Sequence, residues 1–223
     1  MQFPLCKRSA GSFLAVLFCF AIAHGEEAKP RSDLFEKTRL VYEDDFDGEL
    51  NLDFWEVRQA TTWKVEDGIL KGSESSKAFQ AKKIAADDKG HAGFKPVIWL
   101  KQVPENFVCE MRVRWGAEQH NSRFPIFDVG HHIHTIHLGK TLTSLTILKD
   151  KEKLKVEKPL MPLNEWADVT IALKKGVMHF TVNGEQHVFE SDLIDMTGHS
   201  QIDFKGINFG TCDIDYVKVW EGL

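Results

Sequence analysis

Histidines gather in one short segment of the chain, residues 131–137. On a β-strand His132 and His134 would point the same way, because residues two apart share a face. Two imidazoles at that spacing are typical zinc-type ligands, and Asp128 from a neighbouring strand could be a third. His137 has the opposite parity and would need a turn or bulge to join. The other interpretations are ligand binding or acid–base work by at least one imidazole, and a polar strand without metal.

A second set of polar side chains lies on the most regular alternation in the sequence, residues 107–115. The odd-numbered residues are apolar and should pack, whereas Glu110, Arg112 and Arg114 share the other face. Carboxylate and guanidinium groups make directional, charge-assisted hydrogen bonds that suit a polar ligand. The alternative is a solvated face with cross-strand ion pairs, which contribute little stability.

An acidic run lies near the start of the chain, at Glu43, Asp44, Asp45 and Asp47. Oxygen ligands fit calcium, so a structural calcium ion is one interpretation. The other is a set of solvated turn carboxylates.

Most of the chain consists of short strand-like runs separated by turn signals. Residues 63–72 predict a hairpin, because Asp67-Gly68 can supply the positive φ values of a tight turn. Residues 166–189 predict a three-stranded meander with turns at Lys175-Gly176 and Asn183-Gly184.

Two further features complete the fold prediction. Residues 73–93 are polar and predict a long loop, and the last strand, about residues 213–220, changes parity at Tyr216, which a bulge would explain. No long helical period or internal repeat is present in the sequence. Many short strands with regular turns predict an all-β sandwich or barrel.

The N-terminus has the pattern of a secretory signal peptide. Lys7 and Arg8 precede an apolar run, residues 13–23, and small residues follow to Gly25. The run is about 11 residues long, whereas a membrane span needs about 20. We expect cleavage near Gly25, no membrane span in the mature chain, and a secreted or periplasmic protein; an uncleaved anchor is the alternative. The expected organisation is a signal peptide at 1–25, a lead-in at 26–37 and one sandwich domain at 38–223.

The chain after cleavage is acidic and of single-domain length. The full sequence has 223 residues and a net charge of −5, and loss of Lys7 and Arg8 makes it more negative. Nucleic acid is therefore not an expected partner, because its binding relies on neutralised phosphates. The remaining length suits one sandwich with a substantial core. Cys109 and Cys212 remain, as a disulfide or as two buried thiols.

Four motifs occur in order along nearly the whole mature chain. They are Asp45-Phe46-Asp47-Gly48 with Leu52-Asp53-Phe54-Trp55, Trp63 to Leu70, Asn106 to Trp115, and Glu165-Trp166 through Val182-Asn183-Gly184 with the ending Ile214 to Trp220. This series resembles the 3-keto-disaccharide hydrolase family, which shares the concanavalin A-like sandwich of laminarinase-type glycoside hydrolases. The resemblance implies a single jelly-roll β-sandwich and a carbohydrate as ligand or substrate.

The resemblance also implies a mechanism and a place for it. In this fold the open face of a concave sheet is where sugars lie. Oxidation at a sugar C3 acidifies the C2 proton, so that a base can open the glycosidic bond by elimination and water addition, with a group that stabilises the enolate and with or without a divalent metal. We expect the base among Glu110, Asp128 and His134, an enolate stabiliser in Arg112, and substrate contacts from Arg112, Arg114, His132 and His137.

The sequence departs from the related enzymes in two ways. It lacks the Glu-x-Asp-x-x-Glu strand of laminarinase-type enzymes, which counts against retaining chemistry with two carboxylates about 5–5.5 Å apart. Histidines also replace the usual polar and aromatic strand after the Arg-rich one. Of Trp55, Trp63, Trp99 and Trp115, we expect one to be a platform for a sugar ring.

Three functions stay open at this point. The first is an extracytoplasmic glycoside-processing enzyme. The second is a non-catalytic carbohydrate-binding module of the same fold, which needs the aromatic platform and the arginine contacts but no base. The third is a structural cell-surface domain without a sugar ligand.

Overall fold

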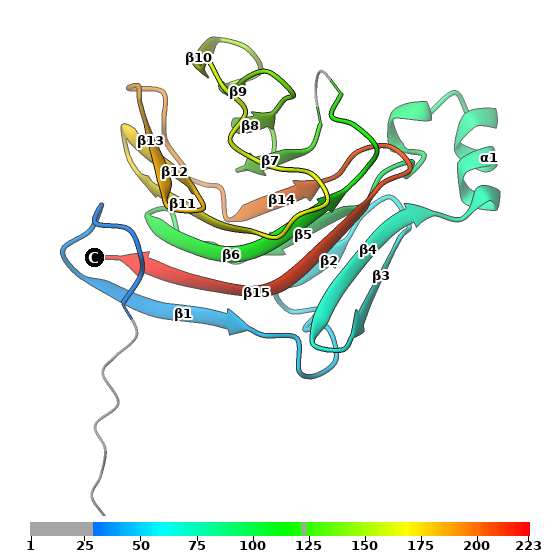
Figure 1. Cartoon of the computed structure of the whole chain (residues 1–223), viewed down its shortest axis with the longest axis horizontal. Helices are drawn as coiled ribbons and strands as arrows, with labels where there is room; N and C mark the ends of the chain where they lie inside the picture. Colours follow the sequence, from blue (N-terminus) through cyan, green and yellow to red (C-terminus); the bar gives the residue numbers. More distant parts are fainter. Residues whose placement is uncertain (1–28, 122–123) are drawn as a thin grey trace, which may run out of the picture.

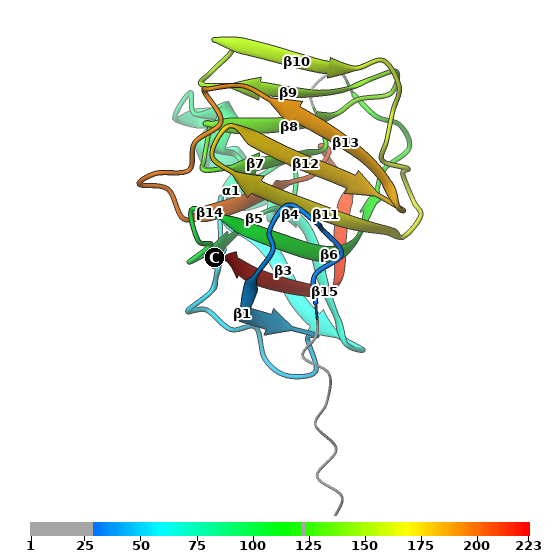
Figure 2. The same ribbon diagram turned by 90° about the vertical axis from the view of Figure 1, so that its left-hand side faces the viewer.

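Two antiparallel β-sheets packed face to face form the body of the described chain (Figures 1 and 2). The computed structural model describes residues 29–121 and 124–223. The apolar side chains of both sheets meet in one core, which includes Phe107, Met111, Phe127 and Phe180. The predicted single jelly-roll β-sandwich is confirmed as the fold class.

The first layer is an eight-stranded sheet, counted over the described residues. Its strands lie in the spatial order β13 (Glu185–Glu190), β12 (Val177–Val182), β11 (Ala167–Lys174), β6 (Phe107–Gly116), β15 (Thr211–Gly222), β4 (Ile69–Ser75) and β3 (Thr61–Glu66), with β1 (Thr38–Asp44) paired to β15.

The second layer is a seven-stranded sheet, again over the described residues. Its strands lie in the order β10 (Glu152–Val156), β9 (Thr143–Ile147), β8 (His134–Leu138), β7 (Ile126–Val129), β14 (Gln201–Lys205), β5 (Val97–Lys101) and β2 (Trp55–Val57).

Local sequence signals account for several of these elements. Asp67 and Gly68 have φ values of 55° and 70° in the predicted β3–β4 hairpin, the conformation that favours such turns. β11, β12 and β13 form the predicted meander. The register of β15 against β6 shifts between Ile214 and Tyr216, so the predicted bulge is confirmed.

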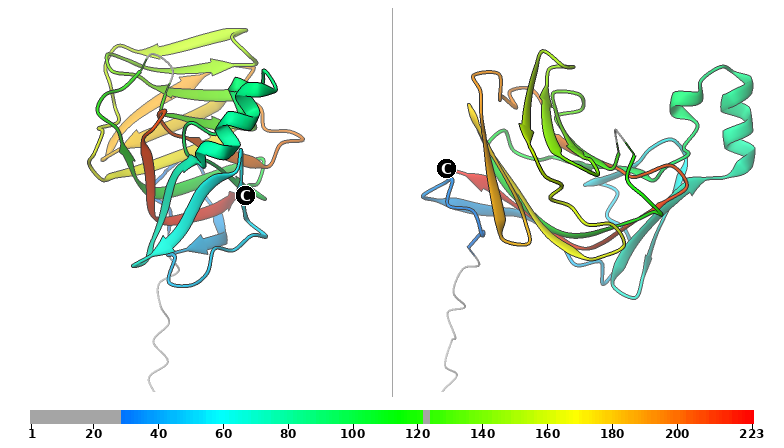
Figure 3. Two further views of the ribbon diagram at one scale, coloured as in Figure 1. Left: turned by 90° about the vertical axis from the view of Figure 1, so that its right-hand side faces the viewer. Right: turned by 45° about the horizontal axis from the view of Figure 1, so that its top comes forward.

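The predicted loop at residues 73–93 was wrong in part, because it contains a helix. Helix α1 (Lys77–Ala85) projects from one end of the sandwich (Figure 3), and the short 3₁₀ helix η1 (Lys89–His91) follows it. The Ser76 side chain caps α1 by accepting a hydrogen bond from Phe79 N at 3.2 Å. Gln80 is its one fully buried residue, so α1 has no apolar stripe that the sequence could have revealed.

The two cysteines of the sandwich do not pair. Both are buried free thiols, and burial raises the pKa of each. Cys109 faces Val219 across the β6–β15 ladder, whereas Cys212 faces Trp115. Six residues of strand β6 therefore separate their positions, about 20 Å at 3.3 Å per residue, far beyond the reach of a disulfide.

The N-terminal part of the described chain lies against the eight-stranded sheet. The predicted signal peptide and the start of the lead-in fall outside the described residues. Arg31 of the lead-in contacts Glu110 and Tyr216 on the outer face of that sheet, and the first strand begins at Thr38. Within the described ranges, no helix combines the length and the apolar character that spanning a bilayer requires.

Candidate functional site

The strand registers align side chains in rows across the outer face of the seven-stranded sheet. Cross-strand partners point to the same face. One row runs from β2 to β10 through Glu56, Trp99, Asp203, Asp128, Thr135, Thr146 and Lys153. A parallel row contains Lys205, Ile126, His137 and Ser144. The intervening residues, such as Phe127 and Phe204, are buried in the core.

Both rows lie along a groove of about 1130 Å³ on this face. We use "the groove" for the space lined by Arg58, Trp99, His131, His132, His137 and Lys205 together with the surrounding loops. Its lining includes His132 and His137, which the sequence predicts as site residues, and Arg58 and Lys205, which it does not.

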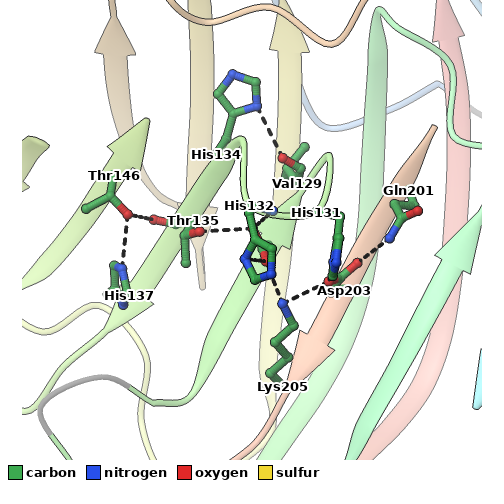
Figure 4. Close-up of polar contacts among 11 residues, drawn as sticks. Val129, His131, His132, His134, Thr135, His137, Thr146, Gln201, Asp203 and Lys205 are labelled. Atoms are coloured by element: carbon green, nitrogen blue, oxygen red, sulfur yellow. Dashed lines mark hydrogen bonds and ion pairs between the residues drawn. The ribbon is translucent and has the colours of Figure 1, made fainter. Parts of the chain in front are cut away.

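His131 is held by Asp203 in the groove (Figure 4). Its Nδ1 lies 2.7 Å from Asp203 Oδ2, and its side chain is 42% exposed. When Nδ1–H donates to this carboxylate, Nε2 keeps its lone pair and can accept a proton. Asp203 is fully buried and its other oxygen accepts from Gln201 Nε2 at 2.8 Å. Asp203 therefore orients the imidazole.

Lys205 lies between two buried carboxylates. Its Nζ is 2.5 Å from Asp128 Oδ2 and 2.9 Å from Asp203 Oδ2. Burial alone would raise the pKa of Asp128, but Lys205 and hydrogen bonds from His132 N and Thr135 Oγ1 hold that pKa below its ordinary value. Asp128 therefore stays ionised and is a weak base. The structure places this predicted catalytic residue under the groove as an anchor for Lys205.

A strained turn between β7 and β8 brings the two adjacent histidines into the groove. Gly130, His131 and His132 all have positive φ, at 81°, 49° and 73°. Only glycine adopts this region without cost, so the two histidines carry backbone strain. Asp128 offsets part of it, because its Oδ1 accepts from His132 N at 2.9 Å. Strain that a buried carboxylate maintains at an open groove is typical of a functional site.

The predicted pairing of His132 with His134 on one face is wrong. The strand begins only at His134, and the positive-φ turn before it rotates His132 to the groove side. His134 instead points into the interior and is fully buried (Figure 4). Its Nδ1 donates to Val129 O at 3.2 Å, and its Nε2 accepts from Asp195 N at 3.2 Å. These contacts leave His134 no access to a substrate.

His137 does lie on the groove face without a bulge. Its Nε2 is 3.1 Å from Thr146 Oγ1, its neighbour across β8 and β9. His132 and His137 therefore both line the groove. An uninterrupted strand would have pointed them to opposite faces, but the positive-φ turn at His132 brings both to the same one.

We expect His134 to make stability depend on pH. Burial lowers its pKa below the ordinary 6.5 in the folded state. The unfolded chain then binds more protons, so this contribution is complete above about pH 6.5 and declines as pH falls towards the folded pKa. Urea unfolding between about pH 7.5 and 5 should show a smaller decline for His134→Gln than for the wild type. The control is His187→Gln, which removes a partly exposed imidazole on β13. The same decline in wild type, His134→Gln and this control would contradict the role of His134.

The structure does not bring Glu110, Arg112 and Arg114 together with the groove. Strand β6 lies in the eight-stranded sheet, and its polar side is the outer face of that other layer. Arg112 pairs with Asp215 at 3.3 Å, and Arg114 pairs with Asp213 at 2.6 Å.

Glu110 is covered on this same face. It is 4% exposed and forms an ion pair with Arg31 at 3.3 Å. Both sheets separate it from Asp128, so no single site contains the two carboxylates.

A divalent metal fits the groove poorly while Lys205 is in place. Asp128, His131 and His132 offer three ligand atoms within 4.8 Å of one another, a set that suits zinc chemically. The Lys205 ammonium already makes the cation contact with Asp128 Oδ2, and His131 Nδ1 is engaged by Asp203. A zinc-type ion on Asp128 Oδ2 would have to displace the Lys205 ammonium, so no step of the chemistry below passes through a metal.

The acidic run is used within the fold. Asp44 Oδ2 accepts hydrogen bonds from Tyr42 OH at 2.5 Å and Trp55 Nε1 at 3.1 Å, and Glu43 forms an ion pair with Lys218. The structural calcium ion stays a prediction, and these contacts give no support to it.

Trp99 is the tryptophan that reaches the groove. The Arg58 guanidinium lies 3.9 Å from the ring centroid, and His131 contacts the ring edge-on at 4.7 Å. Its Nε1 is buried and has no hydrogen-bond partner among the described residues. By contrast, Trp55 and Trp115 are core residues, and Trp63 packs over Gly72.

Sequence reasoning missed Asp203, Lys205 and Arg58, and it noted His131 only within the histidine segment. A usable signal existed for the first two, because Gln201-Ile202-Asp203-Phe204-Lys205 alternates polar and apolar residues as a strand does. No local signal shows that β14 pairs with β7, which is what brings Asp203 and Lys205 beside Asp128.

Several solved structures with a similar fold are enzymes that act on carbohydrates, and three of them share 11–16% identity with this chain. An endo-β-galactosidase from Clostridium perfringens has TM-score 0.57 and 11% identity over 88% of this chain and 66% of that one. This chain thus spans just under two thirds of its length. A non-specific endo-β-1,3(4)-glucanase of glycoside hydrolase family 16 has TM-score 0.58 and 12% identity over 87% and 95%.

A third solved structure is matched over its whole length. The laminarinase from Flavobacterium sp. UMI-01 has TM-score 0.54 and 16% identity over 82% of this chain and 100% of that one. No family model matches the sequence, and no curated protein matches it. The similarities establish the fold: the chain is a jelly-roll β-sandwich of the kind found in these glycoside hydrolases.

Proposed function

We propose that the groove binds a carbohydrate and processes it by acid–base chemistry centred on His131, Asp203 and Lys205. The observation that carries the proposal is the 2.7 Å contact between His131 Nδ1 and Asp203 Oδ2 beside the Lys205 ammonium. A general base oriented by a buried carboxylate and a fixed cation next to it are the two groups that proton abstraction beside a carbonyl needs. The fold that the chain shares with glycoside hydrolases supports a carbohydrate as the ligand.

The finer proposal is hydrolysis of a 3-keto-glycoside. His131 Nε2 removes the C2 proton, and the Lys205 ammonium stabilises the enolate oxygen on C3. Collapse of the enolate expels the leaving-group oxygen from C1, which takes the proton from the His131 imidazolium. Water then adds at C1 and a proton returns to C2. One glycosidic bond breaks and one water is consumed.

The groove offers less support for a retaining glycosidase. That reaction needs two carboxylates that reach the sugar from opposite sides. Asp128 and Asp203 are both fully buried and both paired to Lys205. Neither has the exposed oxygen that a nucleophile or a general acid requires.

The outer face of β6 should be dispensable for this function. We expect Glu110→Gln, Arg112→Gln and Arg114→Gln to keep turnover and carbohydrate affinity within about twofold of wild type, because β6 lies in the other sheet and its polar face points away from the groove. Kinetics and calorimetry on the three folded variants check this. A loss above tenfold in any of them would move the site to that face.

Product analysis by mass spectrometry tests the proposal as a whole. The mature protein is incubated with 3-keto-glycosides and with the matching unoxidised glycosides, with divalent metal in one arm and chelator in the other. We expect a released keto-sugar from the oxidised substrates in both arms. Release only with metal would show that an ion displaces Lys205, and would replace the proposed roles of Lys205 and His131.

A binding-only module is the second candidate, and one observation favours it. The polar groups of the groove satisfy one another: Asp128, Asp203, Lys205 and His131 are already paired. Carbohydrate binding to the groove without any product from either substrate class would support this candidate. Under either candidate function, we propose that the protein is secreted or periplasmic, as its N-terminal residues predict.

A further inference from the structure

The groove carries a charge opposite to that of the molecule. The whole chain has a net charge of −5. Six of the described residues that line the groove are nevertheless Lys or Arg, and Asp150 carries the one carboxylate among those lining residues. The cations are Arg58, Lys95, Lys140, Lys149, Lys153 and Lys205.

Three of these cations are not used by the fold. Lys140, Lys149 and Lys153 are exposed and make no ion pair with any described residue. They come from the β8–β9 loop, the β9–β10 turn and strand β10, so they form the wall of the groove on that side. In contrast, Lys205 is neutralised by two aspartates, and Arg58 pairs with Glu56.

The charges in the groove also act against one another. Burial lowers the pKa of His120, and the nearby Lys140 lowers it further. Burial likewise lowers the pKa of His132, and Lys205 and His131 add to that effect while Asp128 opposes it. An anion in the groove would relieve this repulsion. Unpaired like charges gathered in one hollow cost free energy unless they meet a ligand of opposite charge.

We propose that the carbohydrate held in the groove is anionic, a glycan that bears sulfate or carboxylate groups, and that Lys140, Lys149 and Lys153 bind those groups. This inference rests on the proposed function, because it names the substrate class of the same groove. The His131–Asp203–Lys205 centre then lies between the lysine wall and Arg58 with Trp99. A chain lying across the strands meets cations on both sides of the reacting sugar.

Several features favour a glycan over a nucleic acid as the anion. Among the described lining residues, Trp99 and Phe124 carry the large aromatic rings, and a cation lies over each of them, Arg58 over Trp99 and Lys95 over Phe124. Neither ring therefore offers an open face on which a base could stack. The negative remainder of the surface would repel a long polyanion beyond the groove. A glycan confined to the groove avoids that repulsion.

Isothermal titration calorimetry with four probes tests the inference. They are a sulfated galactan oligosaccharide, an oligogalacturonate, a neutral laminari-oligosaccharide and a single-stranded DNA oligonucleotide, all of similar length. We expect at least about tenfold tighter binding of one or both anionic glycans than of the neutral one, and weaker binding as NaCl rises from about 0.05 to 0.5 M. The sulfated and carboxylated arms decide which anionic group is recognised.

Matched variants assign the effect to the lysine wall. The triple variant Lys140→Gln, Lys149→Gln and Lys153→Gln should lose about tenfold in affinity for the anionic glycan. The control Lys37→Gln, Lys64→Gln and Lys82→Gln removes three exposed lysines elsewhere with the same change in net charge and should bind as wild type.

Three results would overturn the inference. They are equal affinity for neutral and anionic glycans, an equal loss in both triple variants, and DNA binding as tight as that of the best glycan. If the protein turns over neutral keto-glycosides while one of these binding results is found, the proposed function still holds and the anionic substrate alone is rejected. The two claims can therefore be tested separately.

Discussion

His131→Gln is expected to lower kcat on a 3-keto-glycoside by about 10²–10⁴-fold, the usual contribution of a positioned general base. Glutamine occupies similar space and can still donate to Asp203, but it has no nitrogen that accepts a proton. The side chain is 42% exposed, so the protein should keep its fold. Because carbohydrate contacts remain, KM should change much less than kcat.

Two controls make this result specific. His137→Gln changes a second imidazole in the groove, 3.1 Å from Thr146 Oγ1, and should affect KM more than kcat. Asp203→Asn keeps a hydrogen-bonding group but loses the charge that orients His131. It should lower kcat, because a carboxylate no longer orients the imidazole. Full turnover by His131→Gln would show that this imidazole is not the base.

Lys205→Met is expected to destabilise the protein by about 3–5 kcal/mol, the loss typical when one partner of a buried ion pair is removed. Two fully buried carboxylates, Asp128 and Asp203, would remain side by side without their cation. Urea unfolding at pH 7 measures the change. The matched control Lys218→Met breaks a half-exposed pair with Glu43 and should cost less than about 1 kcal/mol.

The stability lost in Lys205→Met should depend on pH in a defined direction. The pKa of Asp128 is lowered in the folded wild type, so its contribution to stability is complete above the unfolded pKa and is lost as pH falls through the folded value. Without Lys205, the folded pKa of Asp128 rises and the contribution at neutral pH disappears. The difference between Lys205→Met and wild type should therefore shrink on acidification towards about pH 4. A constant difference would show that packing, and not charge, accounts for it.

The fold could be predicted because its signals are local. Alternation along β6, the Asp67-Gly68 turn and the parity change at Tyr216 each follow from a few neighbouring residues. Strand β14 has the same kind of alternation, polar at Gln201, Asp203 and Lys205 and apolar between them. Helix α1 gave no periodic signal because it buries almost nothing.

The site could be predicted only in part, because its location depends on pairing between distant strands. The charged residues of β6 and Asp128 of β7 lie on opposite outer faces of the sandwich, and nothing in their local sequence shows which face each strand presents. The histidine parity argument assumed a strand from 132 to 137, whereas a positive-φ turn extends through His132. That turn places His132 in the groove, whereas His134 is buried in the interior. Asp203 and Lys205 are some 75 residues from Asp128 and join it only through the β7–β14 ladder.

The most direct test of the central claim is a crystal structure of the His131→Gln variant soaked with a 3-keto-glycoside or an oligosaccharide. The account predicts a sugar in the groove of the seven-stranded sheet, with a ring within hydrogen-bond distance of position 131 and of Lys205 Nζ, and no sugar on the outer face of β6. A sugar bound only beside Glu110, Arg112 and Arg114, with an empty groove, would contradict it.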